Sequence, residues 1–303
     1  MRILVLGGSG LIGRGLVAAL ARAGDTVAVL SRSALAAPAG PAVHARIQAD
    51  IADADAFNAA VADFRPQVIV HLAAMLQHDC ERDPAGAVAS NVVGTVNVFE
   101  AARAHGVQRV VIASSIAAYG ERHDLMREDD PAPASLSLYG ETKRLGELLG
   151  QRYQQLHGVE MVALRYSGVI GPGGVAGRGM ALARHLLIGT ANGGDVHLDF
   201  VSGEETCHLT HVDDAVAVTV AAIRHPAPRH AVYNVAGPDA NFVSLRDLHA
   251  AVRRQRPAAG RASFSGRARS AGPVDTTRLR EDLGVTPAVG LADGLAAILA
   301  SGA

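Results

Sequence analysis

The residues best suited to chemistry are a tyrosine and a lysine four positions apart, with two serines upstream. Tyr139 and Lys143 belong to the string Tyr-Gly-Glu-Thr-Lys, and Ser114-Ser115 precedes them. On a helix the two side chains would stand on one face, one turn apart. A phenol with an ordinary pKa of about 10 is a poor base, and a neighbouring ammonium group is expected to lower that pKa. With a serine hydroxyl on the same substrate oxygen, the trio could move a proton on or off a secondary alcohol.

Such a trio lacks a hydride acceptor, and the N-terminal sequence predicts a place for one. Residues 2–6 are a short apolar run typical of a strand buried on both faces, and the stretch up to Ala23 has helical character. Between them lies Gly7-Gly-Ser-Gly10-Leu-Ile-Gly13. Its glycines permit a tight turn, a close approach to pyrophosphate, and phosphate binding at the helix N-terminus. A glycine-rich turn can also be a simple tight connection, but strand, turn and helix in this order predict dinucleotide binding.

The end of the next strand, residues 26–30, bears on which dinucleotide would bind. An NAD enzyme usually has an acidic residue there to hold the ribose 2′-hydroxyl. This chain has Ser31-Arg32-Ser33. A serine and an arginine suit a 2′-phosphate better, so the sequence favours NADP over NAD. The alternative is that Arg32 stacks on the adenine or lies in solvent.

Composition excludes several classes of function. The chain has 303 residues, a formal net charge of −1, 4% aromatic residues and no tryptophan. There is no basic stripe with interleaved aromatics, so nucleic acid is not an expected partner. No apolar stretch approaches a membrane span, and the first strand begins too near Met1 to leave room for a signal peptide. Two cysteines, Cys80 and Cys207, do not suggest a disulfide framework. We therefore expect a cytoplasmic protein.

Strand and helix patterns alternate through the first half, which predicts an α/β fold with a doubly wound parallel (Rossmann) sheet. Strands are expected at 2–6, 26–30, 43–48, 67–71, 109–113 and 159–164, and helices at 53–62, 84–105 and 136–157.

After Tyr166 the pattern changes, which predicts a smaller, interleaved C-terminal substrate lobe. We expect helices in this part at 180–188, 212–223 and 245–254, and Ser244 is expected to cap the last of them. A strand at 232–235 is expected to return to the sheet, and residues 253–269 are expected to form loops. The expected division is a dinucleotide-binding domain of residues 1–166 plus about 209–236, and a substrate lobe of residues 167–208 plus about 237–303.

Taken in order, these motifs resemble the extended short-chain dehydrogenase/reductase family, in particular its NAD-dependent epimerase/dehydratase group. The glycine string 7–13 resembles the phosphate loop of that family, and Tyr139-x-x-x-Lys143 its catalytic pair. Further matching strings are Asp50-Ile51, His71-Leu-Ala-Ala74, Asn91-Val-Val-Gly-Thr95, Ser114-Ser115-Ile-Ala-Ala-Tyr119-Gly120, Leu164-Arg165-Tyr166, Gly171-Pro172, His211-Val-Asp213-Asp214 and Tyr233-Asn234.

The resemblance implies a role for each matching residue. Tyr139 would be the general acid/base, Lys143 its partner and a ligand of the nicotinamide ribose, and Ser115 the residue that binds the reacting oxygen. The alternative for the Tyr139/Lys143 pair is a solvated helix face. The implied cofactor contacts are Gly7, Gly10, Leu11, Ile12, Gly13, Ser31, Arg32, Asp50, Ile51, Leu72, Ala73, Ala74, Asn91, Ala113, Tyr139, Lys143, Tyr166 and Val169. The implied substrate contacts are Met75, Ser115, Ile116, Tyr139, Gly168 and Arg178.

Three departures from the family pattern narrow the substrate. Nucleotide-sugar enzymes of the group often have Arg-Asp-Phe, with an arginine that binds diphosphate, where this chain has Cys207-His208-Leu209. After Leu-Arg-Tyr they have an asparagine-containing stretch, where this chain has Ser167-Gly168. The 4,6-dehydratases need an Asp-Glu pair where Ile116-Ala117 stands, so dehydration is disfavoured. Gly203-Glu and His211-Val-Asp-Asp, however, keep the nucleotide-sugar pattern.

Other features have two interpretations. The glycine-rich run 168–179 is either a mobile loop over the substrate, with Arg178 as an anion clamp, or an ordinary connection. Cys207-His208 with His211 and the following aspartates is a poor metal-site candidate, because the segment matches a structural landmark, and no metal is expected. His71 is expected to be a packed histidine at a strand end. The apolar faces of helices 84–105 and 136–157 either pair in a homodimer, as in many relatives, or cover the sheet.

Three functions remain open on the sequence. The first is an oxidoreductase that uses NADP or NAD on a secondary alcohol or ketone of a polar, sugar-like or hydroxy-acid small molecule. The second is a nucleotide-sugar epimerase of the same fold, which would consume no cofactor. The third is a non-catalytic dinucleotide sensor.

Overall fold

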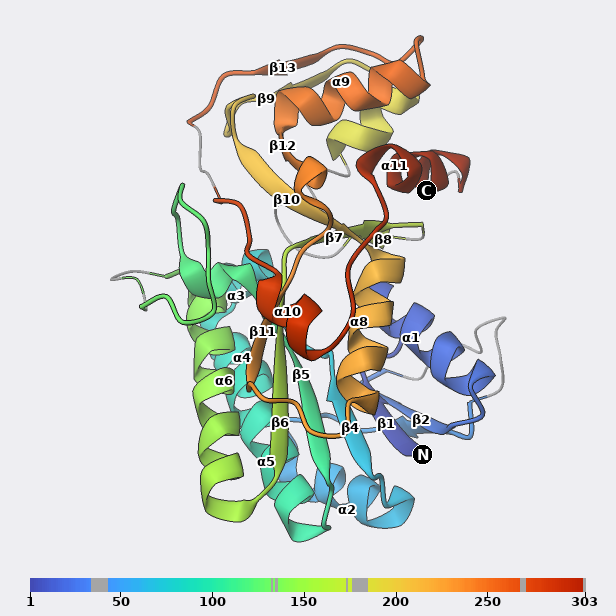
Figure 1. Ribbon diagram of the computed structural model, residues 1–303, viewed down its shortest axis with the longest axis vertical. Coiled ribbons are helices and arrows are strands. Elements are labelled where there is room, and N and C mark those ends of the chain that lie inside the picture. The colour runs from blue at the N-terminus through green and yellow to red at the C-terminus, as the bar shows by residue number, and fades with distance from the viewer. Residues whose placement is uncertain are drawn as a thin grey trace.

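A seven-stranded sheet forms the centre of the computed structural model, which describes residues 1–33, 43–131, 133, 136–172, 174–175, 185–267 and 271–301. All neighbouring strands are parallel, in the order β11-β6-β5-β4-β1-β2-β3 (Figure 1). Their apolar runs are covered on both faces, as a parallel sheet requires. The strands are β1 (Arg2–Leu6), β2 (Thr26–Ser31), β3 (Ala45–Gln48), β4 (Val68–His71), β5 (Arg109–Ser115), β6 (Glu160–Tyr166) and β11 (Val232–Val235).

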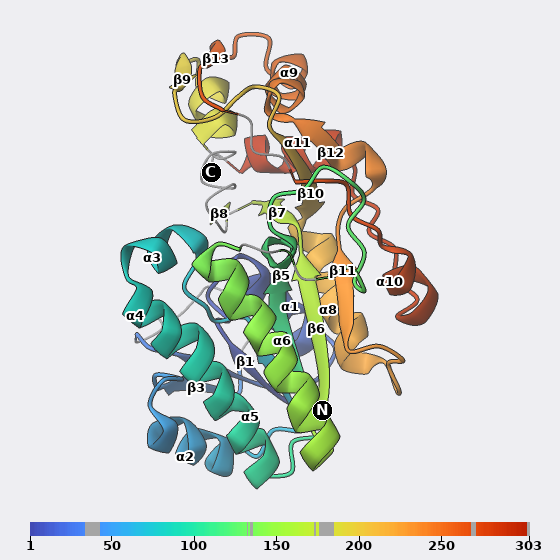
Figure 2. The same ribbon diagram turned by 90° about the vertical axis from the view of Figure 1, so that its left-hand side faces the viewer.

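Helices cover the two faces of this sheet and enclose two separate cores. Helices α1 (Leu11–Arg22) and α8 (Val212–Arg224) pack on one face. Helices α2 (Ala54–Phe64), α5 (Gly94–Ala104) and α6 (Leu138–His157) cover the other, as Figure 2 shows. The predicted doubly wound Rossmann fold is confirmed.

The helix predicted at 84–105 consists of three consecutive pieces. Helix α4 (Pro84–Ala87) leads into a π-helical turn, η1 (Val88–Val93), and then into α5. π-Helical turns inside helices are rare and frequently lie at functional sites. The preceding helix, α3 (Gln77–Arg82), was not predicted, because its sequence Gln-His-Asp-Cys-Glu-Arg offers one buried residue, Cys80, and no apolar period.

A second, four-stranded sheet lies beyond the carboxyl ends of the large one. Its order is β12 (Phe242–Ser244), β10 (Thr206–His211), β7 (Gly168–Gly171) and β8 (Gly174–Val175). Beside it, β9 (Val196–Leu198) pairs with β13 (Ala262–Phe264). Helices α9 (Leu245–Gln255) and α11 (Leu291–Ala300) complete this lobe around its own core. Shorter elements are η2 (Ile116–Tyr119), η3 (His185–Gly189), η4 (Asp239–Asn241) and α10 (Thr277–Asp282).

The second lobe differs from the prediction in places. The Ser244 side chain caps α9 as predicted, accepting a hydrogen bond from the Asp247 N–H at 3.1 Å. Strand β13 lies inside the stretch predicted as loops, because three residues are too few for a recognisable pattern. Of the helix predicted at 180–188, residues 180–184 lie outside the described part.

The chain crosses between the two sheets several times. After β7 and β10 in the second sheet, β11 returns to pair with β6 in the large sheet. The predicted boundary near residue 209 falls inside β10, whose residues Leu209 to His211 pair with β7. The two-part division stays a prediction. In the described ranges no helix combines the length and apolar character needed to span a bilayer.

Candidate active site

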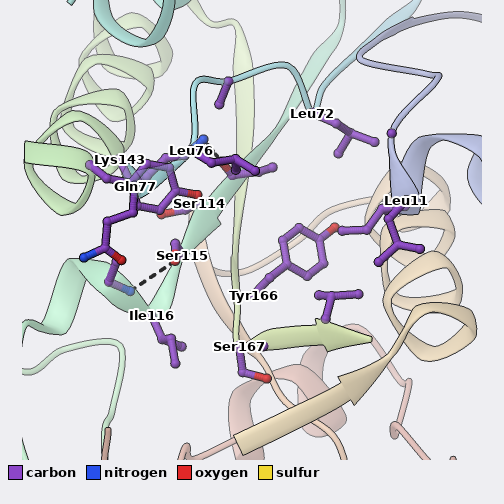
Figure 3. Close-up of a pocket in the computed structure, with 18 of the residues that line it drawn as sticks. Leu11, Leu72, Leu76, Gln77, Ser114, Ser115, Ile116, Lys143, Tyr166 and Ser167 are labelled. Atoms are coloured by element: carbon purple, nitrogen blue, oxygen red, sulfur yellow. Dashed lines mark hydrogen bonds between the residues drawn. The ribbon is translucent and has the colours of Figure 1, made fainter. Parts of the chain in front are cut away.

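One large cavity, of about 1270 Å³, opens where the strands of the large sheet end. Its wall runs from the glycine loop after β1, past the ends of β4, β5 and β6, to the second lobe. Figure 3 shows Lys143 and Ser115 on one side of this cavity and Tyr166 and Leu11 on the other. We call the part lined by residues 7–13 and 31–33 the glycine-loop end. The lobe end is lined by Phe200, Val201, Glu205, Thr206, Cys207, His208, Leu245 and Ala271.

At the glycine-loop end, Gly7, Gly10 and Gly13 have only backbone to offer to the cavity wall. Gly7 has φ of +79°, a conformation that favours glycine, and its carbonyl accepts a hydrogen bond from the Gly10 N–H at 3.0 Å. A Cβ at Gly13 would lie 2.3 Å from the Gly7 carbonyl oxygen, so only glycine allows α1 to begin this close to β1. Gly10, the N-cap of α1, provides no side chain to the first-turn N–H groups. Such N–H groups are suited to binding a phosphate.

The end of β2 forms the next part of the wall. The Ser31 hydroxyl donates to the Ser33 carbonyl at 2.6 Å, and the Gln48 side chain donates to the Arg32 carbonyl at 3.2 Å. Arg32 is exposed and lines the cavity. Among the described lining residues, the two carboxylates are Glu121 and Glu205, and neither belongs to the glycine-loop end. This end therefore combines a guanidinium and hydroxyls without a neighbouring carboxylate.

Tyr139, Lys143 and Ser115 meet at the middle of the cavity. Helix α6 is capped by Ser137, and its first turn packs so tightly on η2 that a Cβ at Gly140 would lie 2.5 Å from the Ala117 carbonyl oxygen. This contact brings Tyr139 next to the end of β5. The Ser115 hydroxyl accepts from the Ala117 N–H at 3.1 Å and also hydrogen-bonds with Tyr139.

The Lys143 ammonium is held by the strand rather than by the phenol. Its Nζ donates to the Ala113 carbonyl at 2.8 Å and lies 5.5 Å from the centre of the Tyr139 ring. Burial lowers the pKa of Lys143 to about 8. Burial also raises the pKa of Tyr139 to about 12, against the smaller effect of the Ser115 hydrogen bond. The expected lowering of the Tyr139 pKa by Lys143 is therefore not found in this structure, where burial is the largest influence on the phenol.

Lys143 is also the only lysine in the sequence; every other cationic side chain of the Lys/Arg class is an arginine. An arginine stays charged at any accessible pH, whereas a buried ammonium can titrate near neutrality. The chain thus has its one titratable aliphatic amine side chain in the wall of the cavity.

A buried ion pair supports this wall from behind. The Glu147 carboxylate of α6 accepts from Arg165 of β6 at 2.7 and 2.8 Å and from the Ser114 hydroxyl of β5. Both charged side chains are almost fully buried. The Arg165 guanidinium lies 4.7 Å from the centre of the Tyr119 ring. The two neighbouring serines therefore have different roles: Ser115 points into the site, and Ser114 ties β5 to α6.

Most of the predicted contacts line the cavity. They are Gly7, Gly10, Leu11, Ile12, Gly13, Ser31, Arg32, Ile51, Leu72, Ala73, Ala74, Ala113, Ser115, Ile116, Tyr139, Lys143, Tyr166, Gly168 and Val169.

Three predicted contacts, Asp50, Asn91 and Met75, do not line the cavity, and a fourth is not described. The Asp50 carboxylate accepts from the Ala52 N–H at 2.9 Å and does not line the cavity. Asn91 is buried and bonds to both backbone groups of Met75, at 2.7 and 3.0 Å, and neither residue lines the cavity. Asn91 thus fixes the segment after β4 rather than facing the cavity. Arg178 lies outside the described residues.

The lobe end contains residues that were not predicted as contacts. The His208 side chain is buried there, with Nδ1 accepting from the Val274 N–H at 3.3 Å and Nε2 donating to the Gly237 carbonyl at 3.0 Å. The Cys207 thiol lies 3.7 Å from the Val243 carbonyl, and burial raises its pKa to about 12. Within the described ranges no group of three or more His, Cys, Asp or Glu side chains could hold a metal ion. The sequence signal that could have identified this end is the departure from the family pattern at Cys207-His208.

Comparisons with known proteins identify a matching family, similar sequences and similar structures. The model of the NAD dependent epimerase/dehydratase family matches residues 3–236. The chain is 33% identical to a UDP-glucose 4-epimerase of Mycolicibacterium smegmatis over 314 residues, which cover 98% of this chain and 96% of that protein. It is 33% identical to a 3-diazoavenalumate denitrifying reductase of a Streptomyces species over 244 residues, which cover 75% of this chain and 73% of that protein. The solved structure of MoeE5 with UDP-glucuronic acid and NAD is 27% identical, with a TM-score of 0.86 over 99% of this chain and 98% of that chain.

Proposed function

Because the chain belongs to the NAD-dependent epimerase/dehydratase family of extended short-chain dehydrogenases/reductases, we propose that it moves hydride between a nicotinamide dinucleotide and a secondary alcohol or ketone. The observation that carries the proposal is the convergence of Ser115, Tyr139 and Lys143 on one cavity with the glycine loop. Gly13 packs so closely on Gly7 that no side chain fits there. Backbone N–H groups of this loop can therefore bind a pyrophosphate.

The chain's own residues would handle the proton. A bound nicotinamide supplies the hydride acceptor or donor. Tyr139 exchanges a proton with the substrate oxygen, and the Ser115 hydroxyl holds that oxygen beside the phenol. The Lys143 ammonium, anchored on the Ala113 carbonyl, stabilises the negative charge that develops on the phenol. A pKa of about 12 makes the buried Tyr139 a protonated acid at rest, which suits reduction of a ketone.

For the cofactor we propose NADP. Arg32 and Ser31 at the end of β2 can bind a 2′-phosphate, and the described part of this end offers no carboxylate for a 2′-hydroxyl. MoeE5 was solved with NAD, and the name of the family refers to NAD. The preference therefore depends on these two side chains alone.

For the substrate we propose a polar, sugar-like or hydroxy-acid molecule without a nucleotide. Among the described residues of the lobe end, the charged side chain is the Glu205 carboxylate. Cys207 stands where the family resemblance implies a diphosphate-binding arginine. A diphosphate contact with arginine is typically worth about 1.5–3 kcal/mol. The second candidate is a nucleotide-sugar epimerase, favoured by the match to the UDP-glucose 4-epimerase over 98% of the chain.

The absorbance of the reduced nicotinamide during turnover tests the proposal. We expect a lasting change with one of a panel of sugars, hydroxy acids and ketones, and no conversion of UDP-glucose. Interconversion of UDP-sugars without a lasting change would establish the epimerase instead.

Two tyrosines of α6 make a matched pair for the role of Tyr139. Tyr139→Phe should reduce turnover more than about a hundredfold. Tyr153→Phe should leave turnover close to that of the wild type, because this hydroxyl bonds to Glu100 outside the cavity. Equal turnover in both variants would remove Tyr139 as the general acid/base, and a wild type that binds the dinucleotide without any turnover would favour a non-catalytic sensor.

We also propose a homodimer. Exposed apolar side chains gather on η1 and α6, including Val93, Leu148 and Leu156, the last two 54% and 57% exposed. A second copy of the chain would cover them. Light scattering should give twice the chain mass for the wild type and one chain mass for Leu148→Glu.

A further inference from the structure

His71, at the end of β4, is a buried histidine with one nitrogen unaccounted for. Its side chain is 5% exposed. Nε2 lies 3.1 Å from the Thr95 hydroxyl, whereas Nδ1 has no hydrogen-bond partner among the described residues. Buried polar atoms are nearly always hydrogen-bonded, so an unpaired one requires an explanation.

The surrounding bonds determine the tautomer of His71. The Thr95 hydroxyl donates its only hydrogen to the Asn91 carbonyl at 2.7 Å. Towards His71 it can therefore act only as an acceptor, so Nε2 carries the hydrogen. Burial, with the nearby Lys143 charge, lowers the pKa of His71 to about 3, which keeps the ring neutral. Nδ1 is thus a bare lone pair that needs a donor.

A small cavity of about 10 Å³ has both His71 and Lys143 among the residues that line it. This volume is at the lower limit for one water molecule. The other polar side chains that line the cavity already have partners. The Thr142 hydroxyl donates to the Tyr139 carbonyl, and the Asn91 amide hydrogen-bonds with the Met75 backbone and the Thr142 hydroxyl. Lys143 has three N–H donors, one of which the Ala113 carbonyl accepts. The unsatisfied acceptor and the donor with spare capacity therefore line the same cavity.

We infer that one buried water bridges Lys143 and His71, accepting from the ammonium and donating to Nδ1, and that His71 is a positioning residue for Lys143. The inference rests on the proposed function, because it assigns His71 a purpose only if the Lys143 ammonium acts in catalysis. The bridge holds the ammonium at the Ala113 carbonyl and stabilises its charged form in a wall that otherwise disfavours charge.

Other groups also act on the Lys143 charge and must stay constant in a test. Beside His71, the titratable groups near Lys143 are Cys80 of α3 and Glu147 of α6, which act on its charge, and Tyr139 of α6, whose ring centre lies 5.5 Å from its Nζ. Cys80 is a buried thiol whose pKa is raised by burial, so it stays neutral near pH 8. Glu147 is paired with Arg165. Among these described groups, His71 is the one with a buried acceptor that lacks a hydrogen-bond partner.

Because Lys143 is the only lysine, a protein labelled with ¹³C at lysine Cε gives one side-chain NMR signal, whose shift follows its protonation. In the wild type we expect this signal to titrate near the Lys143 pKa of about 8. In His71→Leu the pKa should fall by about one unit, because the acceptor for the bridge is removed. In His71→Asn, which keeps an acceptor oxygen near the Nδ1 position, the pKa should lie between the two.

A matched control is His225→Leu, since His225 also has a buried Nδ1 without a partner in the described part, but it follows α8 away from the cavity. In His225→Leu the Lys143 signal should titrate as it does in the wild type. Equal Lys143 titration in all four proteins would overturn the inference. The titration needs no substrate, so it separates this result from a failure of the proposed function.

A turnover measurement adds the catalytic consequence. Because the charged form is lost as pH rises through the Lys143 pKa, the alkaline limb of kcat should move down by the same unit in His71→Leu. Near pH 9 this lowers kcat about tenfold relative to the wild type. If the leucine variant does not fold, a crystal structure of the wild type at atomic resolution tests whether the bridging water is present. Density for one water within hydrogen-bonding distance of both atoms supports the bridge, and a dry cavity overturns it.

Discussion

The glycine-loop end of the cavity is built on one glycine-rich turn and a neighbouring strand end, whereas the lobe end is built from segments far apart in the chain. The first comes from one continuous turn, residues 7–13, and the end of the neighbouring strand β2. The second combines residues 200–208 with Leu245 and Ala271. A continuous turn positions its ligand by local geometry, which a short motif can encode. An assembled wall depends on how distant elements pack, so its shape can change without disturbing the sheet.

The catalytic wall and the lobe also differ in how their charged side chains are paired. Behind the catalytic wall, Glu147 and Arg165 form a nearly fully buried pair. In the lobe, Arg246 and Glu204 form a pair whose side chains are 65% and 69% exposed. Buried pairs cannot lose one member without leaving an uncompensated charge, whereas exposed pairs are solvated in either case. We therefore expect the lobe to tolerate substitutions that the catalytic wall does not.

The largest expected effect tests this difference directly. Glu147→Gln should lower the free energy of unfolding by about 3–5 kcal/mol, because Arg165 would remain buried and unpaired. Glu204→Gln, the matched change in the lobe, should lower it by about 0.5 kcal/mol or less. Urea denaturation of both variants checks the contrast. Similar losses would show that the lobe is as intolerant as the wall.

An intermediate effect is expected at the mouth of the glycine-loop end. Arg32→Asp should weaken NADP binding about 10- to 100-fold, through loss of a charge-assisted contact, and weaken NAD much less. Arg267→Asp, an exposed arginine of the lobe that does not line the cavity, should change neither affinity. Calorimetric titration with both dinucleotides is the measurement. Equal weakening of NAD and NADP by Arg32→Asp would remove the argument for a 2′-phosphate.

The smallest expected effect is at Lys143, whose replacement should raise the free energy of unfolding rather than lower it. Its pKa is lowered from 10.5 to about 8, so in that interval the unfolded chain binds more protons than the folded one. Stability from this group therefore rises with pH between about 8 and 10 and is constant below that interval. Lys143→Met should stabilise the protein at pH 7 by about 1–2 kcal/mol and remove that rise. Thermal unfolding across this pH range measures both. A destabilised methionine variant would mean that the ammonium is better solvated than its burial indicates.

The difference between the ends explains what the sequence could predict. The sheet, the glycine loop and the tyrosine–lysine helix have strong local patterns, and the structure has each of them. Asn91 was predicted as a cofactor contact from a helix motif, but a π-helical turn directs it to Met75. The role of Ser114 could not be predicted, because it depends on Glu147 far along the chain. The lobe end was recognisable only as a departure at Cys207, since short strands and loops there lack periodicity.

The single lysine has a consequence for proteolysis. An endoproteinase that cleaves only after lysine has one possible site in this chain, in the second turn of α6, between residues 143 and 144. That peptide bond belongs to a helix packed on α3, α5 and η2, so cleavage requires the helix to detach or unfold. The rate at which the chain is divided into two fragments therefore reports how often the catalytic wall opens. A ligand that closes on this wall should slow that rate in proportion to its occupancy.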